Sequence, residues 1–127
     1  MQKQTPIKAT ESELEILNIL WAQGPSTVKE VHEKLSLTKD AGYTTTLKLM
    51  QIMLKKQLVS RDGSSKIHVY TAAVDQAQAQ GQMLQRMIET MFNGSAAQLV
   101  MQALGNHRSS KAELELIREY LEGKKKK

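Results

Sequence analysis

Residues 43 to 72 constrain the fold most, because an amphipathic helix pattern there runs directly into a short basic hairpin pattern. At about 100° per residue, one side of the helix collects Thr46, Leu49, Met50, Met53 and Gln57. The opposite side carries Thr44, Lys48, Gln51 and Lys55. The segments "LVSRD" and "KIHVYTA" that follow are rich in β-branched and aromatic residues and flank a Gly-Ser-Ser turn. This pattern predicts a β-hairpin after the helix.

Two further helices are predicted before residue 43. Thr10 and Glu13 have the spacing of a capping box, which marks the start of the first helix. Its apolar residues recur at helical spacing, and Gly24-Pro25 ends it. We expect Ser26 to cap a second helix whose inner face carries Val28, Val31 and Leu35. Three helices followed by a hairpin are the element order of a winged helix-turn-helix domain.

The remainder of the chain, residues 75–127, contains three more apolar stripes at helical spacing, separated by "NGS" and "GNHRSS". About 50 residues of short helix bury little surface by themselves, so we expect a second copy of the chain to cover these stripes. The prediction is therefore a mainly α protein with a small β-hairpin wing. It comprises a winged-helix DNA-binding domain at 1–74 and a helical dimerisation region with a basic tail at 75–127. The predicted dimerisation residues are Leu84, Met87, Ile88, Met91, Leu99, Val100, Leu114, Ile117 and Leu121.

The distribution of charge favours a polyanionic partner. The formal net charge is +5, and the segment from Ala41 to Arg61 has four basic residues and no acidic one. In a major groove, Lys48 can donate to guanine and Gln51 can form two hydrogen bonds with adenine. The other predicted contacts are Thr44 to a phosphate or a thymine methyl, Lys55 to a phosphate, and Arg61, Lys66 and His68 near a neighbouring backbone. Taken alone, the polar stripe of the third helix is more typical of an ordinary solvated face. The order of three helices and a basic hairpin favours DNA binding instead.

Several classes of function are disfavoured by what the sequence contains. The chain has no cysteine, and its three histidines, His32, His68 and His107, are far apart without a paired carboxylate motif. Gly-rich phosphate loops and nucleophile elbows are absent from the sequence. We therefore expect neither an enzyme nor a metal or cofactor protein. The first twenty residues lack the pattern of a secretory signal, and no apolar run is long enough to cross a membrane, so we expect a cytoplasmic protein.

Two alternatives to DNA binding remain. The first is a helical protein-interaction module whose basic face is incidental and which does not bind DNA sequence-specifically. The second is attachment to a membrane surface through the run Lys124 to Lys127, which is disfavoured because no apolar amphipathic segment or lipidation signal adjoins the run.

Four segments together resemble the family of penicillinase and methicillin-resistance repressors and their copper-responsive relatives. They are, in the order of the family, "TESELEILNILW" (10–21), "STVKEVHEKL" (26–35), "YTTTLKLMQIMLKKQLV" (43–59) and "KIHVYTA" (66–72). The resemblance covers nearly the whole chain, and its most specific features are the "YTT" that opens the third helix and the Trp that ends the first. The family often has Arg where this chain has Ile52, and Gly where it has Gln57.

The resemblance implies a dimeric winged-helix repressor that occupies a palindromic operator of double-stranded DNA. It implies that the DNA contacts come from the recognition helix (43–57) and the basic wing, and it adds Thr45 to the predicted contacts. Drug-resistance members are inactivated through a membrane sensor protease, by cleavage of an Asn-Phe bond where this chain has Gln102-Ala103. The copper-responsive relatives bind metal through C-terminal cysteines, which this chain lacks.

Overall fold

The computed structural model describes residues 6–64, 66–106 and 108–125. The predicted first helix is confirmed as α1, Glu11–Gln23. Thr10 is its N-cap, and the Glu13 backbone N–H and side chain complete the expected capping box. The helix ends at Gly24, whose φ of 84° lies in the left-handed region that glycine adopts without strain.

The second helix, α2, spans Val28–Leu35, and its cap differs from the expectation. Thr27 caps it and forms a capping box with Glu30, so the prediction of Ser26 as the cap was wrong. Ser26 instead pairs with Tyr70 through two backbone hydrogen bonds of 2.8 and 2.9 Å. Its hydroxyl donates to the Gly24 carbonyl. Ser26 thus connects the segment before α2 to the hairpin. A capping pattern spans only a few residues and cannot predict this long-range pairing.

The third helix, α3, spans Tyr43–Lys55 and is two residues shorter than the predicted range 43–57. Gln57 has a φ of 64° and is exposed, so it does not belong to the apolar side of the helix. The Leu58 N–H donates to Met53 O and the Gln57 N–H donates to Leu54 O. These two bonds form a Schellman motif, which places Gln57 at the left-handed position where glycine is favoured.

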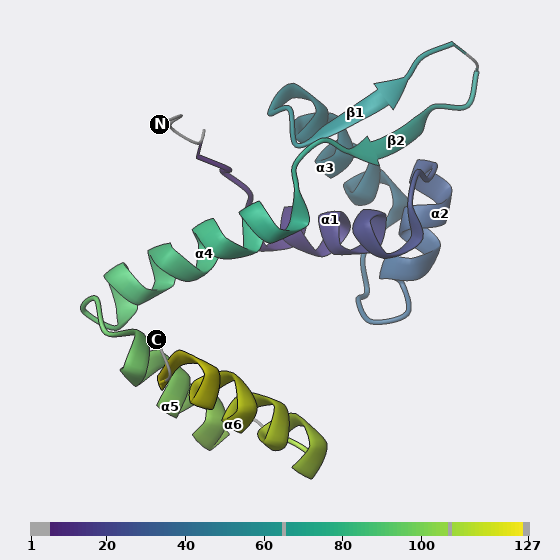
Figure 1. Cartoon of the computed structure of the whole chain (residues 1–127). Helices are drawn as coiled ribbons and strands as arrows, with labels where there is room; N and C mark the ends of the chain where they lie inside the picture. The colour runs from purple at the N-terminus through teal and green to yellow at the C-terminus, as the bar shows by residue number, and fades with distance from the viewer. Residues whose placement is uncertain (1–5, 65, 107, 126–127) are drawn as a thin grey trace. The chain divides into compact units, whose positions relative to one another are not determined.

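The predicted hairpin is confirmed and consists of β1, Val59–Asp62, and β2, Val69–Ala72. The strands are antiparallel, with Val59 opposite Ala72 and Asp62 opposite Val69. Both strands are shorter than the predicted segments. In Figure 1 the loop that joins them extends beyond the ends of the helices.

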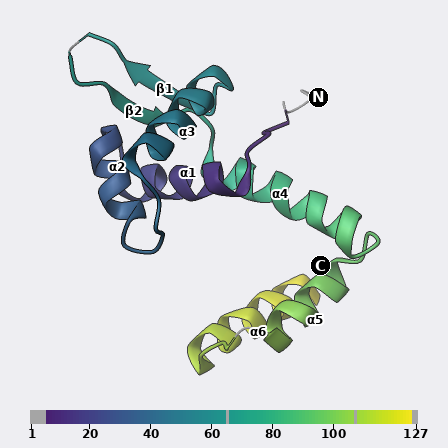
Figure 2. The same ribbon diagram turned by 180° about the vertical axis from the view of Figure 1, so that it is seen from behind.

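The core of this part lies where the three helices meet the hairpin. Its fully enclosed side chains come from every one of these elements, namely Ile16, Leu17, Val31, Thr46, Met50, Met53 and Tyr70. The Trp21 indole N–H donates to Val74 O at 3.0 Å and holds the end of the hairpin on α1. Figure 2, from behind, shows α3 crossing the bundle of α1 and α2 beside the strands. The apolar side of α3 is thereby committed to the core, and its opposite side is left outside.

Three helices follow the hairpin: α4 at Gln76–Met91, α5 at Ala96–Asn106 and α6 at Lys111–Lys125. The chain divides into two compact units, Met1–Met83 and Leu84–Lys127, and the boundary falls within α4. Ala79 of α4 is buried in the first unit, and the Ile7 N–H donates to Gln82 Oε1. In the second unit, none of the described residues is fully buried. No helix within the described ranges is both long enough and apolar enough to cross a membrane.

Candidate nucleic-acid interface

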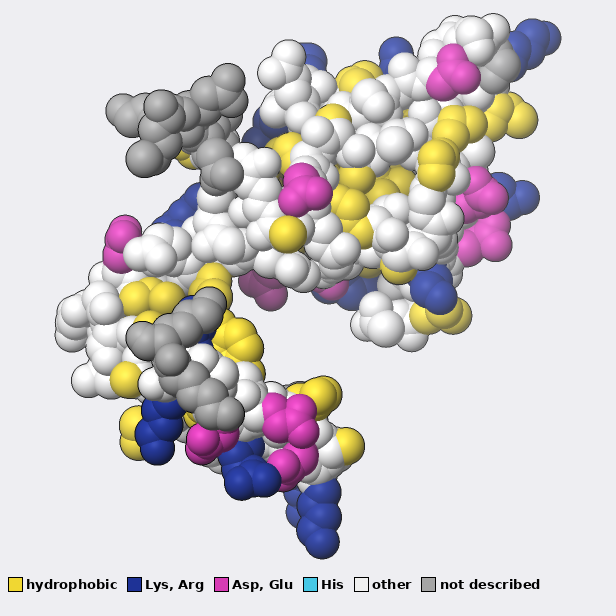
Figure 3. Space-filling view, in the orientation of Figure 1, with side chains coloured by type: hydrophobic (Ala, Val, Ile, Leu, Met, Phe, Trp, Pro, Cys, Tyr) yellow, Lys and Arg dark blue, Asp and Glu magenta, His cyan; other side chains and the backbone are white. Residues whose placement is uncertain are grey.

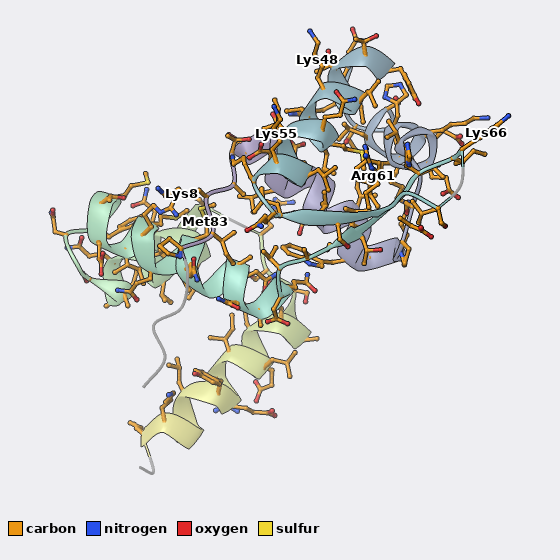
Figure 4. The ribbon with its side chains drawn as sticks, turned by 90° about the horizontal axis from the view of Figure 1, so that it is seen from above. Lys8, Lys48, Lys55, Arg61, Lys66 and Met83 are labelled. Carbon is orange, nitrogen blue, oxygen red and sulfur yellow. The ribbon has the colours of Figure 1, made fainter. Side chains whose placement is uncertain are left out.

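The exposed side of α3 carries the residues predicted to contact DNA. Thr44, Thr45, Lys48, Gln51 and Lys55 are all exposed, whereas Thr46, Met50 and Met53 of the same helix are buried. Figure 4 shows Lys48 projecting from α3 away from the rest of the ribbon. Within the described residues, no ion pair engages Lys48 or Lys55. The ammonium groups of these two lysines are therefore available to a partner.

The hairpin adds two cations beside this helix. Arg61 lies in β1 and Lys66 in the loop between the strands, and both are exposed. Figure 4 shows Lys66 at the far end of the hairpin. Asp62 is the acid nearest to them in the strand, and its carboxylate accepts a 3.0 Å hydrogen bond from the Ser64 N–H. This backbone hydrogen bond holds the Asp62 carboxylate in the local turn of the wing. Because it favours the charged form, it also lowers the pKa of Asp62.

A hollow lies between α2, α3 and the hairpin. Besides apolar residues, its wall contains a set of cationic and hydrogen-bonding side chains, namely Lys29, Tyr43, Gln51, Arg61, Lys66 and His68. Lys29 and Tyr43 were not among the predicted contacts. Lys29 is the second residue of α2, far in sequence from α3, and only the packing of α2 beside the hairpin brings it to this wall.

Contacts with α1 and α2 fix the orientation of α3. The His32 ring on α2 places Nδ1 3.0 Å from Thr46 Oγ1, and Thr46 is fully buried. The same ring meets Tyr43 edge to face, with centroids 5.6 Å apart. At the other end of the helix, Lys56 Nζ lies 2.6 Å from the buried Glu13 carboxylate. Lys56 is thus used for packing, and only three of the four bases from Ala41 to Arg61 remain available to a partner.

The residues predicted to mediate dimerisation lie on α4, α5 and α6. Six of them are exposed large hydrophobics: Leu84, Met87, Met91, Val100, Leu114 and Leu121. The other three, Ile88, Leu99 and Ile117, are half-buried. Figure 3 shows hydrophobic side chains at the surface of this unit, interspersed with charged ones. An isolated second unit therefore leaves much apolar surface in water.

The histidines do not form a metal site in the described part of the chain. His32 and His68 are half-buried, and His107 lies outside the described residues. Among those residues, no group of three or more His, Asp or Glu side chains is arranged to hold a metal ion.

Three helices and a hairpin, with the outer side of the third helix left acid-free and exposed, define a DNA-binding domain of the winged-helix class. The family model described as penicillinase repressor matches residues 9–123. The chain belongs to this family. The predicted family and fold class are thereby confirmed, and the chain is a DNA-binding repressor, not an enzyme.

Two relatives illustrate the similarity in sequence. The methicillin resistance regulatory protein MecI of Staphylococcus aureus strain N315 is 24% identical over 115 residues, covering 91% of this chain and 94% of the relative. The transcriptional regulator BlaI of Mycobacterium tuberculosis is 38% identical over 56 residues, covering 43% of this chain and 41% of the relative.

Two solved structures are similar in fold. The solution structure of the DNA-binding domain of the repressor BlaI aligns with a TM-score of 0.51 at 24% identity, covering 60% of this chain and 92% of that one. The monomeric form of Bacillus licheniformis BlaI, solved in complex with the blaP half-operator, aligns with a TM-score of 0.50 at 22% identity. That alignment covers 57% of this chain and 89% of the other. These likenesses show the winged-helix fold.

Proposed function

We propose that this protein is a dimeric transcriptional repressor that blocks a promoter by occupying a palindromic operator. The observation that carries the proposal is the exposed side of α3, on which hydrogen-bonding and cationic side chains follow one another without an acid. Such a face suits a major groove, where phosphates attract cations and base edges offer hydrogen-bond partners. Repression by occupancy requires no catalysis. We place this repression in the cytoplasm, where the promoter is accessible.

The side chains divide into base contacts and backbone contacts. Lys48, near the middle of the exposed face, donates to guanine, and Gln51 pairs with adenine. Thr44 and Thr45, in the first turn of α3, reach a phosphate or a thymine methyl. Backbone phosphates are bound by Lys55, Arg61 and Lys66. The relative from Bacillus licheniformis that shares this fold was solved with a half-operator, which supports DNA as the partner of this domain.

Dimerisation is assigned to the helical region at residues 75–127, and DNA binding to residues 1–74. The exposed leucines, methionines and valine of α4 to α6 support this assignment, because an unpaired chain leaves them in water. A second copy offers the same apolar stripes for an isologous interface. Two domains related by a two-fold axis would read the two halves of a palindrome.

Inactivation by a sensor protease, as the family resemblance implies for drug-resistance members, would act on α5. Gln102 and Ala103 lie within this helix and are exposed. Proteases bind an extended backbone, so cleavage would require α5 to open first. A helix without fully buried residues opens at low cost, which makes α5 accessible to such an event. The side chains at this bond differ from the Asn-Phe pair of those members, so a protease of different specificity is needed.

The proposal is tested by the salt dependence of binding to duplex DNA. A fluorescent duplex from the region upstream of the protein's own gene is titrated with the full chain between 50 and 200 mM salt. A dimer that neutralises about 6 to 10 phosphates loses on the order of 10³-fold or more of its affinity over this range. A footprint on the same region identifies the operator. Affinity that is insensitive to salt, with no protected palindrome, would contradict the proposal and favour the helical interaction module.

A further inference from the structure

One residue on the exposed side of α3 does not fit its polar surroundings. Ile52 is 47% exposed, although it lies four residues after Lys48 and three before Lys55 on the same side of the helix. Its immediate neighbour Met53 is fully buried. Met53 therefore contributes the apolar side chain of this helical turn to the core, and Ile52 does not.

Neither local structure nor packing accounts for isoleucine at this position. An exposed helical site favours Lys, Gln or Leu, because a β-branched side chain loses rotamer freedom against the preceding turn. Ile52 also has no place in the core formed by Ile16, Met50 and Tyr70. The side chain therefore offers an apolar spot on a face that otherwise offers hydrogen bonds and positive charge.

We infer that Ile52 is a specificity-determining residue, which contacts the C5 methyl group of a thymine on the floor of the major groove. The inference rests on the proposed function and adds that the operator must contain a thymine at the position that Ile52 contacts. Among the groups that base pairs present in the major groove, the thymine methyl is the apolar one, and aliphatic side chains are its matching contacts. Lys48, one turn before Ile52, donates to a guanine, and Lys55, one turn after it, binds a phosphate. Ile52 then selects a T·A pair next to that guanine.

The test removes the methyl group from the DNA and the side chain from the protein. The full chain first selects a consensus from a random duplex library, and each thymine of that consensus is then replaced in turn by deoxyuridine. Deoxyuridine pairs like thymine but lacks the C5 methyl. Binding is measured for the wild type, Ile52→Ala and Ile52→Val. The matched control is Leu37→Ala, which removes an exposed apolar side chain outside α3.

The inference predicts one thymine in each half-site at which deoxyuridine weakens wild-type binding about fourfold, as expected for one buried methyl group. Leu37→Ala and Ile52→Val keep this sensitivity, and Ile52→Ala loses it. If Ile52→Ala is as sensitive as the wild type at every thymine, or if no thymine matters to either protein, the inference is wrong although operator recognition stands. A library that yields no consensus would overturn the proposed operator recognition itself, and this inference with it.

Discussion

Glu13 and Lys56 join the first turn of α1 to the end of α3 through a 2.6 Å contact between the carboxylate and the ammonium group. The same carboxylate oxygen accepts the Thr10 N–H at 2.9 Å, so a single atom closes a helix cap and anchors the third helix. The Glu13 side chain is almost completely buried, whereas Lys56 keeps about a third of its surface. This pair therefore connects the stability of the domain to the orientation of its DNA-binding helix.

Replacement of Glu13 by Gln should destabilise the first unit by about 1–3 kcal/mol, because it removes a charge-assisted hydrogen bond from a buried site. Gln retains the capping-box geometry, so the loss reports on the pair with Lys56. Urea denaturation measures the free energy of unfolding. The matched control is Glu15→Gln, which breaks the exposed pair with Lys39 and should leave stability nearly unchanged, because water and salt screen such a pair. Equal losses for the two variants would contradict the role assigned to Glu13.

Acid should weaken this domain through the same carboxylate. Burial raises the pKa of Glu13, but the hydrogen bonds from Lys56 and Thr10 outweigh it and leave the pKa below its usual value of 4.5. The stabilisation is therefore fully present above the pKa of the unfolded state and is lost as the pH falls through the lower folded-state value. Unfolding free energies measured from pH 6 to pH 3 should fall less steeply in Glu13→Gln than in the wild type. Identical slopes would show that Glu13 carries no such linkage.

Replacement of Gln57 by Gly should stabilise the protein by about 0.5–1 kcal/mol. Gln57 is held at a φ of 64°, where a side chain crowds the backbone and glycine does not. Gly24 provides the reverse control, since it has a φ of 84° and Gly24→Ala should destabilise by roughly 1 kcal/mol. Thermal unfolding followed by circular dichroism measures both changes. A stabilising Gly24→Ala variant would contradict this explanation of the helix ends.

Replacement of Leu114 by Asp should convert the protein to a monomer without unfolding it. Leu114 is 45% exposed in the single chain, so the charge is tolerated there, but an unpaired carboxylate in a dimer interface costs several kcal/mol. Leu116→Asp is the control, because Leu116 lies on the opposite side of α6 from Leu114 and Leu121. Sedimentation equilibrium should show a monomer for the first variant and a dimer for the second. Dimers in both cases would place the interface elsewhere.

Much of the fold could be predicted because its determinants are local. The cap at Thr10, the break at Gly24 and the two-sided pattern of α3 each lie within a few residues, where helix and turn chemistry acts directly. The same is true of the exposed side of α3, since the residues that a helix leaves outside follow from those it buries.

The features that escaped prediction depend on tertiary contacts. Ser26 has the chemistry of a cap, but its pairing with Tyr70 bridges more than forty residues of sequence. Lys56 belongs to the basic segment, and only its contact with Glu13 shows that its charge is paired within the domain. Lys29 reaches the hollow beside the hairpin through the placement of α2. The spacing of residues along the sequence does not show which distant residues will be in contact in the folded protein.

The central claim, that the exposed side of α3 reads the operator, is tested most directly by the Lys48→Ala variant. Its affinity is measured for the footprinted operator and for a random duplex at the same salt concentration, with Lys34→Ala on α2 as a matched exposed-lysine control. The account predicts that Lys48→Ala weakens operator binding by about 1–3 kcal/mol and narrows the ratio of operator to random affinity, while Lys34→Ala leaves that ratio unchanged. An equal loss on both duplexes, or no loss on the operator, would contradict it.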